Sequence, residues 1–173
     1  MTDHENLELM RTLFHYDSET GNLWRTHILT GKVYLTANPG LSRYRKVKIG
    51  KEVIYAHRLI WFILYGFYPI NDIDHINGNK KDNRLCNLRE ATRSQNKANE
   101  PKRKRKGCSS KYKGVNFIKA SKRWRASGVI NMKFISLGTF ANEIDAATAY
   151  NRFAMETFGE FALVNNIEKA NNE

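Results

Sequence analysis

The amino-acid sequence predicts an α+β chain of two small units. Residues 72–96 read as a strand, a polar loop, a second strand and the start of a helix, whereas residues 111–158 read as three short strands and one helix. Between them lies a run of cations bounded by Pro101 and Gly107. A chain of 173 residues is long enough for two such units. We therefore expect an N-terminal unit at 1–100, a linker at 101–110, a C-terminal unit at 111–166 and a polar tail at 167–173.

Composition narrows the class of protein. The net charge of +12 favours a polyanionic partner, although a structural RNA-binding protein would carry the same charge. The two cysteines, Cys86 and Cys108, form no CxxC pair, which argues against a disulfide framework or a zinc ribbon and favours the reducing cytoplasm. The N-terminal residues are acidic and polar, unlike a signal peptide, and the longest apolar run, 59–65, is too short to span a membrane. We expect no membrane association.

Two helices are expected in the N-terminal unit. Residues 7–14 place apolar side chains at helical spacing, and Gly21-Asn22 then punctuates a turn into a short strand. Residues 56–66 are apolar nearly all round and end at Gly66, which predicts a buried helix. His57, at the start of this helix, is most simply a structural residue.

A cationic hairpin precedes the second helix. Residues 44–54 alternate in polarity, with Gly50-Lys51 at the expected tip. Five cations lie between residues 43 and 51, and a solvated strand face explains them about as well as contacts to nucleic-acid phosphates do. The candidate phosphate contacts are Arg43, Arg45, Lys46 and Lys48.

Residues 72–96 carry side chains suited to phosphodiester hydrolysis. This reaction needs an activated water and stabilisation of the charge on the phosphoryl oxygens and the leaving 3′-oxygen. His75 suits the general-base role because imidazole titrates near neutral pH. Asp74 and Asn96 offer hard oxygen ligands, which suit Mg²⁺ or Mn²⁺. Asn87 could fix the loop or hydrogen-bond the imidazole.

This ordered set resembles the HNH homing endonucleases of bacteriophage and intron type. The resemblance implies a ββα-metal (His-Me finger) unit, with one divalent ion held by Asp74 and Asn96, His75 as general base and Asn87 as an orienting residue. The wider superfamily has His where this chain has Asn96, so a neutral amide replaces an imidazole there. The matching residues are His57-Arg58-Leu59, Gly66, Pro69, Asp74-His75-Ile76-Asn77-Gly78, Asp82-Asn83-Arg84, Asn87-Leu88-Arg89, Thr92 and Asn96.

The cation run between the units reads as a linker. Its like charges repel one another and keep it extended. A passive spacer is one interpretation, but we favour a linker that also tracks DNA phosphates, because each neutralised phosphate releases counterions. The cations are Lys102, Arg103, Lys104, Arg105 and Lys106.

The C-terminal unit separates its charges. Residues 111–133 hold seven Lys or Arg and no acid, whereas residues 142–160 hold four acids and one Arg. Asn142 is a natural N-cap for the helix, which Gly159 should end. The sheet rather than the helix should therefore meet the nucleic acid, with Lys113, Arg123 and Arg125 as contacts. Trp124 is expected in the sheet core.

This unit resembles the Apetala-two (ethylene-response-factor type) DNA-binding domain over about residues 111–166. The resemblance implies a three-stranded antiparallel sheet in the major groove with one helix behind it. The plant members read bases with arginines on the sheet, but the corresponding positions here are mostly Asn116, Ile118, Val129, Phe134 and Ser136, so their base preference does not carry over. The matching residues are Tyr112-Lys113-Gly114-Val115, Trp124-Arg125-Ala126, Leu137-Gly138-Thr139-Phe140, Glu143, Ala146-Ala147, Ala149-Tyr150, Gly159, Ala162 and Asn165.

The sequence therefore predicts a site-directed, homing-type endonuclease that nicks double-stranded DNA as a monomer with Mg²⁺ or Mn²⁺. It would act in the cytoplasm, which is that of the host cell if a bacteriophage encodes it. The competing class is a non-catalytic, sequence-specific DNA-binding regulator with a degenerate nuclease motif. An RNA-binding protein would explain the charge but neither motif.

Overall fold

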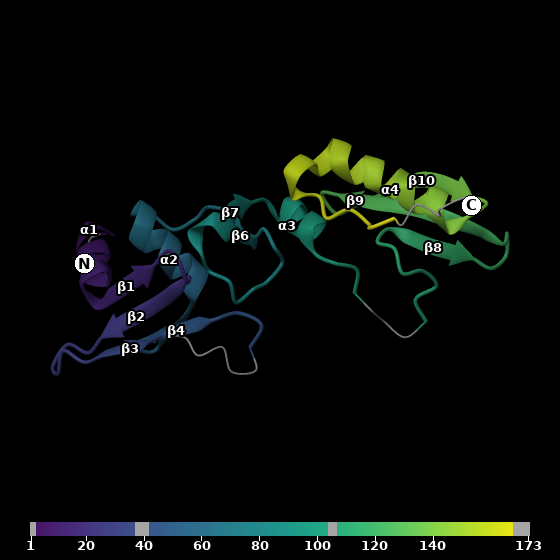
Figure 1. Ribbon diagram of the computed structural model, residues 1–173. Coiled ribbons are helices and arrows are strands. Elements are labelled where there is room, and N and C mark those ends of the chain that lie inside the picture. The colour runs from purple at the N-terminus through teal and green to yellow at the C-terminus, as the bar shows by residue number, and fades with distance from the viewer. Residues whose placement is uncertain (1–2, 37–41, 104–106, 168–173) are drawn as a thin grey trace. The chain divides into compact units, whose positions relative to one another are not determined.

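A computed structural model describes residues 3–36, 42–103 and 107–167 (Figure 1). The chain divides into two compact units, residues 1–92 and 93–173, and each is described by itself. Within the described ranges, α-helices and small antiparallel sheets alternate along the chain, which confirms the predicted α+β class. Every helix in these ranges is too short or too polar to cross a bilayer.

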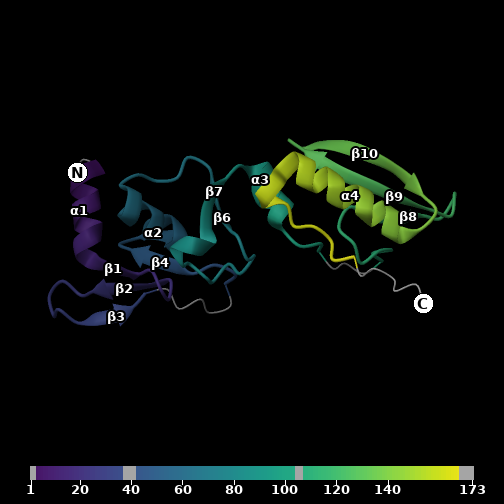
Figure 2. The ribbon, with the colours of Figure 1, turned by 45° about the horizontal axis from the view of Figure 1, so that its top comes forward.

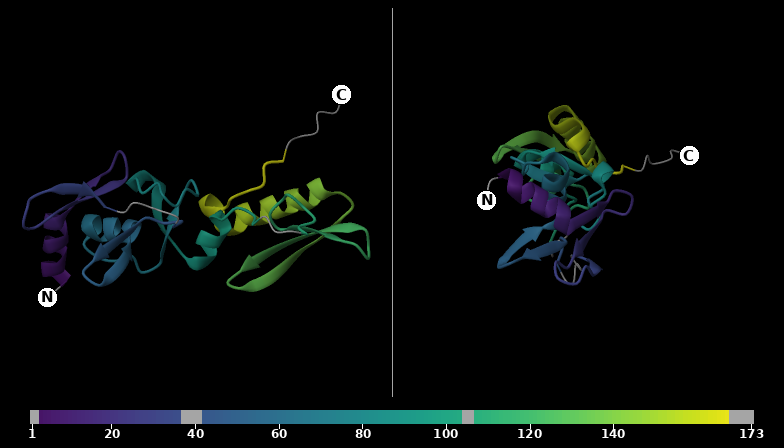
Figure 3. Two further views of the ribbon diagram at one scale, coloured as in Figure 1. Left: turned by 90° about the horizontal axis from the view of Figure 1, so that it is seen from below. Right: turned by 90° about the vertical axis from the view of Figure 1, so that its left-hand side faces the viewer.

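The first unit opens with a helix and a three-stranded sheet. Helix α1 (Asp3–Leu13) leads into β1 (Phe14–Asp17), β2 (Asn22–Thr26) and β3 (Val33–Leu35), in the order β1-β2-β3. The expected helix at 7–14 therefore begins earlier and ends one residue sooner, because Phe14 pairs with Arg25 in the sheet. Helix α1 packs beside α2 (Ala56–Tyr65), as Figure 3 shows.

The predicted cationic hairpin is present. Strands β4 (Lys46–Ile49) and β5 (Glu52–Tyr55) pair antiparallel, with Gly50 at positive φ in the tip. Val47 is buried while Lys46 and Lys48 on either side of it are exposed, as the alternation predicted.

The hairpin runs directly into the buried helix. Ala56, the first residue of α2, donates its N–H to the carbonyl oxygen of Arg45 at 3.0 Å. Leu59 and Ile60 are fully buried, and the helix ends at Gly66 in the left-handed conformation that glycine favours. The prediction of a buried helix over 56–66 is confirmed.

Strand β6 (Asp72–His75) pairs antiparallel with β7 (Leu88–Ala91). The short 3₁₀ turn η1 (Leu85–Asn87) precedes β7. Ile73 and Leu88 join the core formed by α2 and the N-terminal elements. This core fixes the two strands on which Asp74, His75 and Arg89 lie.

The second unit contains the predicted three strands and helix. Strands β8 (Val115–Ile118), β9 (Arg123–Ile130) and β10 (Lys133–Phe140) form an antiparallel sheet in the order β10-β9-β8. Helix α4 (Glu143–Phe158) lies along this sheet, as Figure 2 shows, and η2 (Gly159–Phe161) follows it. The Asn142 side chain accepts the N–H of Asp145 at 2.8 Å, which confirms the predicted N-cap.

Helix and sheet approach closely because small residues line their interface. A side chain at Gly114 would overlap the ring of Tyr150, and one at Gly128 would overlap the ring of Phe153. The buried alanines of α4 contribute to the same packing. Trp124 is half-buried against this core with its ring centroid 4.9 Å from that of Phe117, in the place expected for it.

Helix α3 (Arg93–Asn99) belongs to the second unit and packs against α4 and η2. The sequence predicts residues 93–100 as part of the N-terminal unit. The sequence offers Thr92 or Ser94 as the N-cap of this helix. The helix begins at Arg93, so Thr92 precedes it, whereas Ser94 lies inside it and its hydroxyl contacts Asn131. The division at residue 93 therefore differs from the expected division at residue 100.

Candidate active site on strands β6 and β7

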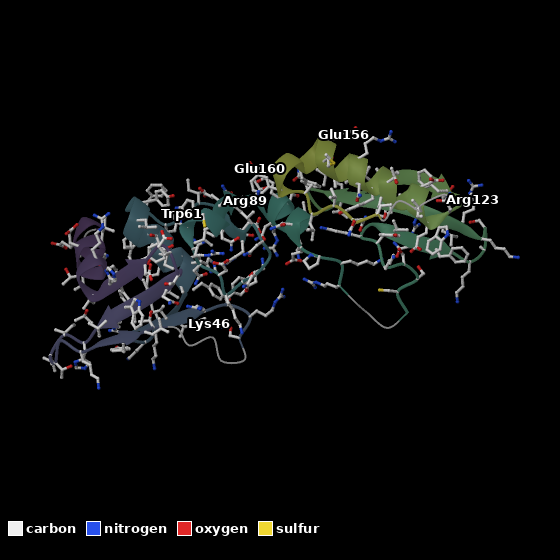
Figure 4. The ribbon with its side chains drawn as sticks, in the orientation of Figure 1. Lys46, Trp61, Arg89, Arg123, Glu156 and Glu160 are labelled. Atoms are coloured by element: carbon white, nitrogen blue, oxygen red, sulfur yellow. The ribbon has the colours of Figure 1, made fainter. Side chains whose placement is uncertain are left out.

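Asp74 and His75 end strand β6 in a fully buried environment, each with 0% of its surface exposed. Asp74 faces Arg89 across the two-stranded ladder, and its Oδ2 accepts hydrogen bonds from Arg89 Nε at 3.1 Å and Nη2 at 3.0 Å. A buried carboxylate is costly unless it is paired in this way. Arg89, labelled in Figure 4, therefore holds the Asp74 carboxylate in one orientation.

The His75 imidazole contacts Asn83, a residue for which the sequence predicts no separate role. His75 Nε2 lies 3.1 Å from Oδ1 of Asn83, which is itself 1% exposed. An amide oxygen only accepts, so Nε2 carries the hydrogen and Nδ1 keeps the lone pair. Asn83 stood among the motif residues of the resemblance, but no periodicity indicated that its side chain reaches the imidazole.

Burial and this hydrogen bond act in opposite directions on His75. Burial lowers the pKa of His75, and the hydrogen bond to Asn83 partly offsets this by raising it. Together they lower the pKa of His75 from its usual value, so the imidazole is neutral at neutral pH. A neutral imidazole is the form that can accept a proton.

His57 packs against His75 from the start of α2. The two ring centroids are 5.2 Å apart with the rings edge to face, and Tyr55 stacks on His57 at 5.6 Å. Burial lowers the pKa of His57 to about 3, with neighbouring His75 as the next cause. His57 is therefore a neutral aromatic wall of the site, in keeping with the structural role expected for it.

Asn87 joins the two ends of the loop that follows β6. Its Nδ2 donates to the carbonyl oxygen of Asp82 at 2.8 Å, and its Oδ1 accepts the N–H of Asn77 at 2.9 Å. Of the two contacts considered for Asn87, the structure shows the one to the loop. The contact to the imidazole is made by Asn83.

The metal ligands predicted from the sequence lie in different units. Asp74 is a buried oxygen donor beside an imidazole, and a carboxylate of this kind fits Mg²⁺ or Mn²⁺. Asn96 lies on α3 in the second unit. In the part of the chain that the structure describes, no three His, Cys, Asp or Glu side chains gather into a metal-binding group. The ligand roles of Asp74 and Asn96 stay predictions.

The cations of the β4–β5 hairpin divide into exposed and engaged side chains. Arg43, Lys46 and Lys48 are exposed, and Figure 4 labels Lys46. Lys46 Nζ lies 5.5 Å from the ring centroid of Tyr55. Arg45 instead donates from Nη1 to Asn22 Oδ1 at 2.7 Å and so ties the hairpin to β2.

Two cations of the second unit lie exposed on its sheet. Arg123 and Arg125 on β9 are exposed, and Arg125 lies 5.7 Å from the ring centroid of Phe134. Figure 4 shows Arg123 on the sheet and Glu156 on the face of α4 that is turned away from the sheet. The predicted separation of charge between sheet and helix is therefore present at these positions.

Lys102, Arg103 and Lys113 make contacts within the protein. Lys113 Nζ donates to the carbonyl oxygens of Lys97 at 3.3 Å, Ala98 at 2.5 Å and Glu100 at 2.6 Å. Lys102 Nζ donates to the carbonyl oxygens of Tyr112 and Val115. Arg103 pairs with Glu100 at 3.5 Å, and Lys104, Arg105 and Lys106 lie outside the described residues.

Comparisons with known proteins show the family of the chain. The profile of the HNH endonuclease family matches residues 54–98, from the end of β5 to α3. An uncharacterized HNH endonuclease of Acanthamoeba polyphaga mimivirus is 40% identical over 140 residues, which cover 75% of this chain and 71% of the viral protein. No solved structure matches the chain. The identity and extent of the match to the viral protein, together with the family profile, establish that the chain belongs to the HNH endonucleases.

Proposed function

We propose that this chain is a homing-type endonuclease that nicks double-stranded DNA with His75 as its general base. The observation that carries the proposal is the geometry at the end of β6. There His75 donates from Nε2 to Asn83, keeps the lone pair on Nδ1, and adjoins the buried Asp74 carboxylate. At the pH of a cell His75 is in its neutral form, which is the form that accepts a proton.

In the reaction, His75 Nδ1 accepts a proton from a water molecule as the water oxygen bonds to phosphorus. The bond from phosphorus to the 3′-oxygen breaks, which leaves a 5′-phosphate and a 3′-alkoxide that takes a proton from solvent. Asn83 Oδ1 stabilises the imidazolium through the Nε2–H hydrogen bond. A divalent ion held by Asp74 and Asn96 would stabilise the negative charge on the phosphoryl and leaving oxygens.

DNA binding is proposed for two exposed cationic surfaces. Arg43, Lys46 and Lys48 of the hairpin would contact phosphates in the first unit. Arg123 and Arg125 would do so on the open face of the sheet in the second unit.

The Apetala-two role of the second unit rests on its motif residues and its separated charges, because the family match ends at residue 98. A tethered DNA-binding unit raises the local concentration of the nuclease at its target. We propose that the enzyme acts as a monomer in the cytoplasm of a host cell, a setting that the viral relative supports.

Plasmid cleavage tests the proposal. The intact chain should cut supercoiled plasmid with Mg²⁺ or Mn²⁺ and not with excess chelator. His75→Ala should lose about a hundredfold or more in rate while gel-shift affinity for DNA is unchanged. The matched control is His27→Ala, which removes an exposed histidine and should cut normally. Cleavage by His75→Ala at the wild-type rate would contradict the assignment, and binding without any cleavage by the intact chain would favour the regulator.

A further inference from the structure

We propose that Asn83 is a positioning residue that fixes the tautomer of His75, and that the N-terminal β1–β2 hairpin holds Asn83 in place. This inference rests on the proposed role of His75 as general base. It extends the catalytic machinery to residues 14–26, which lie outside the family match at 54–98.

The contact between Asn83 and His75 selects one of two tautomers. A neutral imidazole in water exchanges its hydrogen between Nδ1 and Nε2, and only the nitrogen without the hydrogen can act as base. Asn83 Oδ1 lies 3.1 Å from Nε2, and both side chains are buried, so water cannot replace this acceptor easily. The Nε2–H form is therefore favoured, and Nδ1 is the base.

The hairpin contacts the Asn83 backbone at two points. Tyr16 Oη donates to the carbonyl oxygen of Asn83 at 3.0 Å. Gly21, at φ +70°, lies so close that an added Cβ would stand 2.7 Å from the Asn83 carbonyl carbon and 2.5 Å from the Arg84 nitrogen. Any side chain at Gly21 would push the hairpin and the Asn83 peptide apart.

The hairpin turn is itself braced. Gly21 N–H donates to the Asp17 carbonyl oxygen at 2.9 Å, and the Asp17 carboxylate accepts from the Thr20 hydroxyl at 2.5 Å and from the Glu19 N–H at 3.0 Å. Phe14 and Leu23 anchor the two strands in the core. These contacts hold the hairpin in one conformation. The hairpin thereby positions Asn83, which in turn contacts His75.

Nitrogen NMR tests the tautomer directly. Long-range ¹H–¹⁵N correlation spectra of the intact chain, recorded without metal or DNA, distinguish protonated from unprotonated imidazole nitrogens. Wild-type His75 should show the hydrogen on Nε2 only. Asn83→Leu, which has a similar volume and no acceptor, should show both tautomers, and Asn83→Asp, which keeps an acceptor, should restore Nε2–H.

Kinetics complete the test. Asn83→Leu should lower kcat by at least about tenfold without changing KM for DNA, because the variant loses the hydrogen bond that stabilises the imidazolium and part of the molecules carry the hydrogen on Nδ1. Tyr16→Phe, which removes one hydroxyl and leaves the core filled, should lower kcat severalfold. Its matched control, Tyr34→Phe, alters an exposed tyrosine of β3 and should have no effect.

Two results would overturn the inference. One is wild-type His75 with its hydrogen on Nδ1. The other is Asn83→Leu with the wild-type tautomer and kcat. Equal kcat values for Tyr16→Phe and Tyr34→Phe would show that the β1–β2 hairpin does not support Asn83. If His75→Ala is inactive and Asn83→Leu cuts normally, only this inference is overturned. If His75→Ala is active, the proposed function is overturned.

Discussion

Replacing Lys113 with methionine should destabilise the second unit rather than weaken DNA binding. The sequence predicted Lys113 as a DNA contact, but in the structure its ammonium donates to three carbonyl oxygens at the C-terminal end of α3, those of Lys97, Ala98 and Glu100. Burial lowers the pKa of Lys113 to about 8. An ammonium has three donors, and all three are used within the protein.

The magnitude follows from the contacts that methionine cannot make. Hydrogen bonds from a charged donor contribute about 1.5–3 kcal/mol each, and a cation at a helix C-terminus adds about 0.3–1 kcal/mol. Desolvation of the ammonium offsets part of this, so we expect a loss of about 2–4 kcal/mol. The Lys113 backbone bonds to the Asn165 side chain, at 2.6 and 3.1 Å, remain in the variant, so the loss reports the side chain alone.

Urea unfolding and DNA binding together provide the assay. Lys113→Met should lower the unfolding midpoint with an unchanged slope, whereas the control Lys111→Met, which alters an exposed neighbour, should not. The DNA affinity of folded Lys113→Met should match that of wild type at each salt concentration. Lys113 would instead be a DNA contact if Lys113→Met unfolds like Lys111→Met and the slope of log affinity against log salt concentration falls by about one, as expected for a lost phosphate contact.

Three further predictions concern the metal, the product and acid stability. Chelator-treated protein should stay folded, and Mg²⁺ or Mn²⁺ should restore cutting, because the proposed ligands are oxygens; tightly bound zinc in the treated protein would contradict this. Open-circle plasmid with 5′-phosphate ends should precede linear plasmid, since one site hydrolyses one phosphodiester; linear DNA as the first product would indicate a dimer. Burial lowers the pKa of His57 from 6.5 to about 3, so the folded state binds fewer protons than the unfolded state below about pH 6.5. The contribution of His57 to the free energy of unfolding should therefore be fully present above that pH and should shrink by about 2 kcal/mol at pH 5. In urea unfolding, His57→Phe should lose less stability than wild type between these pH values. An identical pH dependence of the two proteins would refute this.

Local sequence patterns alone determined several secondary-structure elements of this protein. The alternation around Val47, the apolar run of α2 and the Asn142 cap each depend on residues within one or two turns of one another, and each is present where predicted. The Asp74–His75 pair is equally local, because adjacent residues at the end of a strand remain adjacent in any fold. That is why the sequence was sufficient to indicate the nuclease family.

Only the tertiary structure decided which side chains support that pair. Asn83 accepts a hydrogen bond from Tyr16, 67 residues earlier in the chain. In the second unit, likewise, the Lys113 backbone N–H donates to the Asn165 side chain, 52 residues later. Such contacts depend on how core packing brings distant segments together, and neither periodicity nor spacing encodes them. Contacts of this kind also place α3 in the second unit. The carbonyl oxygens at its C-terminal end accept hydrogen bonds from Lys113 and from the N–H of Leu163, so the boundary between the two units lies before the helix and not at the basic linker.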